Sequence, residues 1–102
     1  MEGINMIHEI VIQAVDPAKR DEYVREFGQT LKDADFAGSH AIKLFTSIED
    51  PSRVILIIEW DSVESHTRHR GTPAHNHMRE VGSKYQTAKS EGAHFMLHEV
   101  KS

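Results

Sequence analysis

Apolar and polar residues alternate along parts of the chain, as they do in strands that are half buried. Residues 6–14 are rich in β-branched side chains and place alternate residues on opposite faces. Residues 40–47 alternate in the same way. Residues 53–60 are apolar almost throughout, which is typical of a central strand covered on both faces. A fourth strand is predicted over residues 94–100.

A first helix is predicted between the first two strands. Asp16 and Pro17 form its start, because an aspartate side chain accepts hydrogen bonds from the free amides of a first turn and proline loses no bond at the first helical position. Apolar residues then recur at every fourth position, so one stripe of the helix is apolar as far as about residue 32. This stripe contains Tyr23, Phe27 and Leu31.

Two further helices are predicted after the third strand. A short one covers about residues 62–70, and a longer one begins at Thr72 and Pro73 and runs to about residue 90. The order is β-α-β-β-α-β, the ferredoxin-like α+β arrangement, with strands one and three central and helices on one sheet face. We expect residues 1–102 to form one domain. The uncovered sheet face predicts a homodimer.

The charge pattern and the cysteine content narrow the function classes. The 12 basic and 16 acidic residues are mixed along the chain, which argues against the basic stripe that nucleic acids or anionic membranes need. Without cysteine there is neither a disulfide framework nor a thiolate metal site. The longest apolar run, residues 54–58, is too short to span a bilayer, and residues 1–5 do not resemble a secretion signal. We expect a cytoplasmic protein.

Histidine is enriched in this chain. Eight histidines occur in 102 positions, and four of them fall between residues 66 and 77. Because imidazole titrates nearer to neutrality than other side chains, acid-base chemistry or metal binding has to be considered. The histidines are at positions 8, 40, 66, 69, 75, 77, 94 and 98.

The predicted elements indicate which histidines share a pocket. His66 and His69 lie three residues apart and therefore on one helix face, and His75 lies on the inward stripe of the longer helix. If the strand face that carries His8 is the helix-covered one, His8, His69 and His75 converge. Trp60, at the end of the central strand, is expected beside them.

Three interpretations of this cluster stay open. Neutral imidazoles bind zinc, copper or iron, although no H-E-x-x-H or C-x-x-C spacing occurs. The histidines can also be merely structural. We favour general acid-base work on a bound organic molecule. This interpretation leaves out His40, His77, His94 and His98.

Residues 36–75 resemble the central block of antibiotic-biosynthesis-monooxygenase domains. The shared features are the glycine before the second strand, the E-D-P-S-R hairpin, the E-W-D-S end of the third strand and the T-P-x-H start of the longer helix. The resemblance implies a dimeric α+β barrel with one pocket per subunit. It also implies cofactor-free oxygenation of phenolic or anthrone-like molecules, in which the anion of the substrate reacts with O2.

Single positions can be compared within this resemblance. Trp60 corresponds to the tryptophan that lines the pocket of anthrone oxygenases, while their asparagine and tyrosine correspond to Leu56 and His66. The tryptophan and histidine of haem-degrading members fall near His69 and Arg79, so haem turnover is not implied.

A second, local resemblance is to plant polyketide cyclases of the related stress-responsive barrel group. His8 and the Pro73-Ala74-His75 segment fit the two histidine positions of those cyclases, and His69 stands where they have a tyrosine. This resemblance implies a histidine-driven cyclisation or isomerisation without oxygen.

The leading hypothesis is a cofactor-independent, monooxygenase-like enzyme with no bound metal, acting on a small aromatic or polyketide-like substrate. His75 is the expected general base, with His8 and His69 as partners. The residues expected to bind substrate are Trp60, His66, Leu56, Phe27 and Tyr23. The alternatives are a non-oxidative cyclase or isomerase, and a non-catalytic or metal-binding dimeric module.

Overall fold

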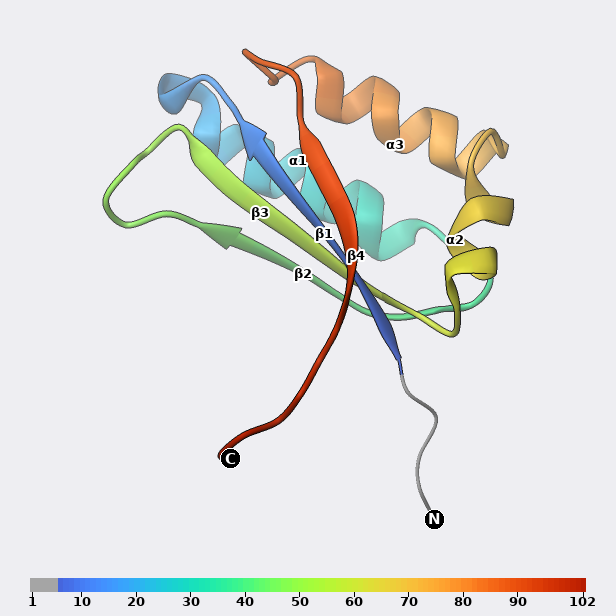
Figure 1. The fold of residues 1–102 in the computed structure, drawn as a ribbon. Coiled ribbons are helices and arrows are strands. Elements are labelled where there is room, and N and C mark those ends of the chain that lie inside the picture. Colours follow the sequence, from blue (N-terminus) through green and yellow to red (C-terminus); the bar gives the residue numbers. More distant parts are fainter. Residues whose placement is uncertain (1–5) are drawn as a thin grey trace.

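The computed structural model describes residues 6–102 and shows an antiparallel four-stranded sheet with helices on one face (Figure 1). The strand order is β2-β3-β1-β4, so the central strands are those that the sequence predicts. The ferredoxin-like α+β arrangement is confirmed. The elements are β1 (Ile7–Ala14), a 3-10 turn (Pro17–Lys19), α1 (Arg20–Asp33), β2 (Ser39–Thr46), β3 (Arg53–Trp60), α2 (Val63–His69), α3 (Pro73–Ser83) and β4 (Glu91–Met96).

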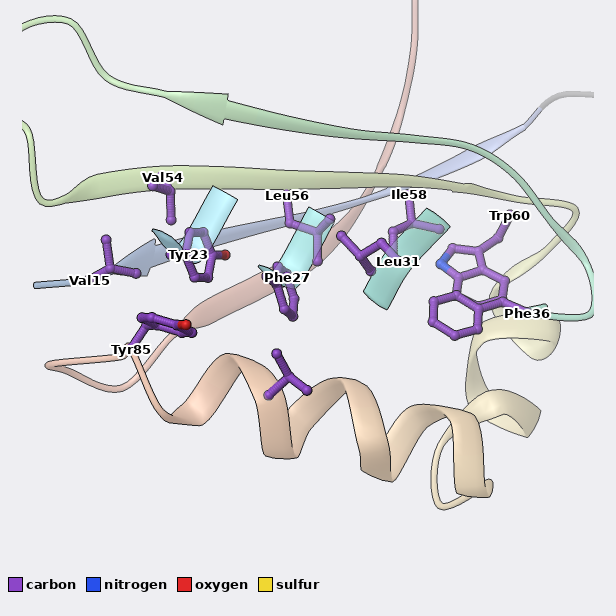
Figure 2. Packing of buried hydrophobic residues seen from close by; sticks show 11 residues of the cluster. Val15, Tyr23, Phe27, Leu31, Phe36, Val54, Leu56, Ile58, Trp60 and Tyr85 are labelled. Carbon is purple, nitrogen blue, oxygen red and sulfur yellow. The ribbon is translucent and has the colours of Figure 1, made fainter. Parts of the chain in front are cut away.

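The core lies between the sheet and the helices. Alternate residues of β3 are buried on the helix-covered face, where they meet the apolar stripe of α1. Figure 2 shows these two rows facing each other, with Tyr85 at one end and Trp60 stacked near Phe36 at the other. The rows are Val54, Leu56, Ile58 and Trp60 from β3 and Tyr23, Phe27 and Leu31 from α1.

The end of α3 and the start of β4 differ from the prediction. The helix ends at Ser83 rather than near residue 90, because the chain then turns toward the end of β1. The amide of Asp16 donates to the carbonyl of Tyr85 (3.2 Å), and the amide of Thr87 donates to that of Ala14 (3.0 Å). Pairing with β1 therefore replaces helical bonds. As a result β4 begins and ends earlier than expected.

The pocket prediction required the helices to cover the face of β1 that carries His8, but they cover the other face. Glu9 and Gln13 point to the helices, where Glu9 accepts a hydrogen bond from the indole of Trp60 (2.9 Å) and Gln13 accepts one from the hydroxyl of Tyr23. His8 lies on the open face, with Nε2 3.3 Å from a carboxylate oxygen of Glu59. The predicted convergence of His8 with His69 and His75 is therefore wrong.

The open face of the sheet is largely apolar. In the register of the strands, Ile10 and Ile12 of β1 lie beside Ile57 and Ile55 of β3. Phe45 of β2 and Phe95 of β4 extend this surface on either side, and both are half exposed. No helix in the part of the chain that the structure describes is long and apolar enough to cross a bilayer.

Candidate functional site

A cavity of about 670 Å³ lies between the sheet and α3. Its apolar wall is formed by Val11 of β1, Leu56 of β3 and Phe27 of α1. Its opposite wall is polar and comes from α3 and from the end of α2. The cavity can therefore hold the flat apolar body of a small molecule and present cations and hydrogen-bond donors to one edge. The polar wall includes Arg70, His75, Asn76, Arg79 and Glu80.

The two arginines give this cavity an excess of positive charge. Arg70 follows α2, and Arg79 lies one turn after His75 on α3. Within residues 6–102 neither guanidinium takes part in an ion pair, whereas Glu80, the acidic residue of the wall, lies 3.8 Å from His77. Both arginines are exposed and available to a ligand. The wall therefore favours an anion.

The start of α3 fixes the orientation of His75. Thr72 caps the helix, because its hydroxyl oxygen accepts a hydrogen bond from the backbone amide of His75 (3.2 Å). The amide of Gly71 in turn donates to Nδ1 of the His75 ring (3.2 Å). Burial lowers the pKa of His75, and the nearby Arg79 acts in the same direction. A neutral His75 therefore carries its proton on Nε2, where it is a hydrogen-bond donor.

His69 packs in the aromatic end of the core. Its ring lies 4.2 Å from that of Phe36, 5.3 Å from that of Trp60 and 5.0 Å from that of His75, measured between centroids. Burial lowers the pKa of His69 to about 4, so the ring is neutral at pH 7. His69 lines a separate cavity of about 400 Å³, together with Thr72. The rings of His69 and His75 thus lie against each other, but they line different cavities and not the one pocket that the sequence suggested.

A second polar cluster lies beside this pair. Trp60 donates to one oxygen of Glu9, and the other Glu9 oxygen lies 3.3 Å from Nε2 of His66. Nδ1 of His66 lies 2.7 Å from Nε2 of His94 on β4. Burial raises the pKa of Glu9, against the effects of Trp60, His94 and Arg70. Burial also lowers the pKa of His66 to about 4.

The remaining predicted substrate residues divide between cavity and core. Leu56 and Phe27 line the cavity. Trp60 and His66 stack on each other with ring centroids 5.2 Å apart, next to the cavity rather than on its wall. Tyr23 is fully buried and does not line the cavity.

Sequence reasoning missed Glu9, Arg70 and Arg79 and left out His94. The sequence leaves open which face of the first strand the helices cover, and the pairing of Glu9 with Trp60 depends on strand register. His94 of β4 is the strand partner of Glu9 in the pairing of β1 with β4. The sequence does carry a signal for Arg79, because this residue lies four positions after His75, one helical turn along the same face.

The described residues show no arrangement suited to a metal. Among residues 6–102, no group of three or more histidine, aspartate or glutamate side chains could hold a metal ion. The nitrogens of His66 already face Glu9 and His94, and Nδ1 of His75 accepts the amide of Gly71.

The fold and the cavity can be compared with known structures. A Bordetella bronchiseptica protein named for the antibiotic biosynthesis monooxygenases superposes with a TM-score of 0.82 at 24% identity, covering 89% of this chain and 95% of that one. A conserved Methanosarcina mazei protein gives 0.77 at 15% identity, covering 90% and 92%. A Nitrosomonas europaea protein, also named for these monooxygenases, gives 0.73 at 17%, covering 100% and 99%. These likenesses show the fold.

Sequence comparison gives the family. A search of curated protein sequences found no match. The model of the antibiotic biosynthesis monooxygenase family matches residues 6–81, which span β1 through most of α3 and include every residue of the cavity wall named above. This chain therefore belongs to the antibiotic biosynthesis monooxygenase family.

Proposed function

We propose that the protein is a cofactor-independent oxygenase that holds a small aromatic or polyketide-like phenol or enol as its anion in the cavity under α3. The observation that carries this proposal is the lining of that cavity. Arg70, His75 and Arg79 all line the cavity, together with the apolar residues Val11 and Leu56. Family membership supports a monooxygenase-like role.

This lining fits the chemistry of an electron-rich anion. The two guanidinium groups stabilise a phenolate or enolate, and the apolar wall excludes water from the ring that reacts. The anion gives one electron to O2, and the resulting radical pair combines to a peroxide that loses water. Overall, a CH2 group becomes C=O, one atom of O2 enters the product, and the other leaves as water with the two hydrogens.

We assign His75 the role of a hydrogen-bond donor to the substrate oxygen, in place of the general base that the sequence suggested. Its Nδ1 is occupied by the amide of Gly71, so the nitrogen left for a ligand is Nε2, which is protonated in the neutral ring. A donor that is already oriented lowers the cost of forming the oxyanion, because no reorganisation is needed when the charge develops.

The second candidate is a non-oxidative isomerase or cyclase. It is favoured by Leu56, which places an aliphatic side chain on the cavity wall where the resembling oxygenases have an asparagine. Enolisation needs the same anion stabilisation and no oxygen. Uptake of O2 therefore separates the two functions.

The test uses 1,8-dihydroxyanthrone as the probe in an oxygen electrode with parallel absorbance readings. We expect one O2 to be consumed per probe molecule, and we expect His75→Ala to lower kcat/KM by about 10²- to 10³-fold, as for loss of an oriented donor. His77→Ala is the matched control, because His77 is largely exposed on the same helix and does not line the cavity. Its activity should equal that of wild type.

A second pair of variants tests the positive wall. Arg70→Ala should raise KM for the anionic probe, whereas Arg68→Ala should not, because Arg68 lies two residues earlier, in α2, and does not line the cavity. Turnover of the probe without uptake of O2 would replace the oxygenase by an isomerase or cyclase. Equal activity of His75→Ala and His77→Ala would place the reaction outside this cavity.

A further inference from the structure

Three ionisable side chains that the proposed chemistry does not yet use lie in one row. Glu9 belongs to β1, His66 to α2 and His94 to β4. Glu9 and His94 are direct neighbours across the two strands, and His66 lies against both from the helix side. The side chains of Glu9 and His66 are 15% and 7% exposed, whereas His94 is half-buried on the edge strand. The row thus leads from the interior to the solvent.

We propose that Glu9, His66 and His94 form a proton relay that carries the proton of the substrate from the interior of the helix-covered face to solvent at β4. This inference rests on the proposed function, because it supplies the proton path that formation of the substrate anion needs. Glu9, His66 and His94 position and move a proton, whereas other groups hold the substrate.

Trp60 fixes the direction of the relay. An indole N–H can only donate, so the Glu9 oxygen that it contacts is always an acceptor. Any proton on Glu9 therefore sits on the other oxygen, Oε2, which faces Nε2 of His66. At 3.3 Å this contact is slightly longer than an ordinary hydrogen bond, so it is the step that must tighten for transfer.

The relay has two states that differ by one proton. In the loaded state, Glu9 is neutral and donates to Nε2 of His66, Nδ1–H of His66 donates to Nε2 of His94, and His94 carries its proton on Nδ1. In the unloaded state, Glu9 is a carboxylate, and both histidines carry their protons on Nε2. Passage between the states moves one proton from Glu9 to His66, one from His66 to His94 and one from His94 to water. The net result is one proton released when the substrate anion forms. The reverse passage returns one proton when the peroxide loses water, so a complete turnover releases none.

Glu9 is not part of the cavity wall, but residues that line the cavity surround it. Val11, which lines the cavity, is the next residue of β1 on the same face. The charged and titratable groups that face Glu9 are His66 and Arg70 of the α2 region, His75 of α3 and His94 of β4, together with the indole of Trp60. Burial raises the pKa of Glu9 above its ordinary value, which favours the neutral, proton-carrying form of the carboxyl group.

The variant Glu9→Gln tests, without any substrate, whether the protonation of Glu9 sets the tautomers of His66 and His94. The amide oxygen must accept from Trp60, so its NH2 group faces His66 and imposes the loaded arrangement. At pH 8, long-range proton–nitrogen correlation spectra should show both His66 and His94 protonated on Nε2 in wild type and on Nδ1 in the variant. Circular dichroism and the amide spectrum establish that the variant is folded.

Glu59→Gln is the matched control. Glu59 lies at the same 3.3 Å from a histidine, His8, but on the open face of the sheet. The Glu59→Gln variant should leave the tautomers of His66 and His94 unchanged. A variant Glu9→Gln in which only His66 changes, or neither ring does, would overturn the relay.

Turnover supplies the second readout. His94→Ala should lower turnover of 1,8-dihydroxyanthrone about tenfold or more, as for loss of a positioned proton acceptor, and added imidazole should restore it. Full activity of His94→Ala, or a loss that imidazole does not restore, would contradict the role in proton transfer. If no phenolic probe is turned over, the proposed function fails, while the tautomer experiment still decides whether the relay exists.

Discussion

At the scale of single residues, His69 is a polar ring in an aromatic environment. It contacts Phe36 and Trp60, and its Nε2 is buried and finds no hydrogen-bond partner among residues 6–102. A charged imidazolium there would lose its hydration without gaining an anion. The low pKa of His69, about 4, and the equally low pKa of His66 follow mainly from this burial. Protonation of either ring therefore costs stability.

Acid should therefore destabilise the protein through these two rings. The unfolded chain binds protons on histidine near pH 6.5, whereas the folded chain does so only near pH 4, so the free energy of unfolding falls as the pH decreases from 6.5 to 4. Each ring contributes up to roughly 3 kcal/mol to this loss, and the two are coupled. Glu9, whose pKa is raised in the folded state, acts in the opposite direction.

His69→Phe isolates the contribution of one ring. Urea unfolding at several pH values between 4 and 7.5 should show a weaker dependence on pH in His69→Phe than in wild type. His77→Phe, at a largely exposed position of α3, should keep the wild-type dependence. The explanation fails if all three proteins lose stability equally in acid.

Glu9 and His8 show why the site could not be predicted fully from the sequence. Both faces of β1 carry apolar residues, so alternation alone does not say which face the helices cover. Polarity alone would place Glu9 and Gln13 on the solvent side. They lie in the interior because Trp60 and Tyr23 supply hydrogen bonds from β3 and α1, and such partners depend on tertiary structure.

At the scale of the elements, local signals predicted most of the fold. The apolar run of β3 and the Thr72-Pro73 start of α3 lie where the sequence places them. The end of α3 differs from the prediction, because Tyr85 lies outside the helix and its hydroxyl group donates hydrogen bonds to Glu22 and Glu26 of α1. Residues 84–90 carry no local signal strong enough to predict that contact. The displaced strand β4 follows from the same turn.

Substitution of Gly38 tests whether the loop before β2 fixes the position of α2. Its φ is +86°, and a Cβ there would lie 2.8 Å from Cβ and 2.7 Å from Oγ of Ser65 on α2. Gly71 has a similar φ of +81° with no atom within 4 Å of such a Cβ. Gly71→Ala should therefore cost only the backbone strain, about 1 to 2 kcal/mol, whereas Gly38→Ala should cost clearly more.

Urea denaturation of the two alanine variants measures this difference directly. Because both glycines share the left-handed conformation, the excess in Gly38→Ala reports the contact with Ser65. Equal losses of stability in the two variants would show that α2 moves away freely and that its position does not depend on this loop.

At the scale of the whole molecule, the helices cover one face of the sheet and leave the other bare. The bare face presents isoleucines from the two central strands, flanked by Phe45 and Phe95, each 49% exposed. The chain beyond β4 runs away from the sheet (Figure 1) and carries the exposed apolar residues Leu97 and Val100. A contiguous apolar surface of this kind favours association with another sheet.

We predict that the protein is a homodimer in which two such faces pack together. In a twofold interface each substitution occurs twice, so Phe45→Glu combined with Phe95→Glu places four carboxylates in a surface that loses its water on association. Sedimentation at micromolar concentration should show a dimer for wild type and a monomer for this double variant. Val24→Glu, which puts the same charge on a 37% exposed position of α1, should remain dimeric. A wild-type protein that sediments as a monomer would contradict this prediction, because the apolar face would then remain uncovered in water.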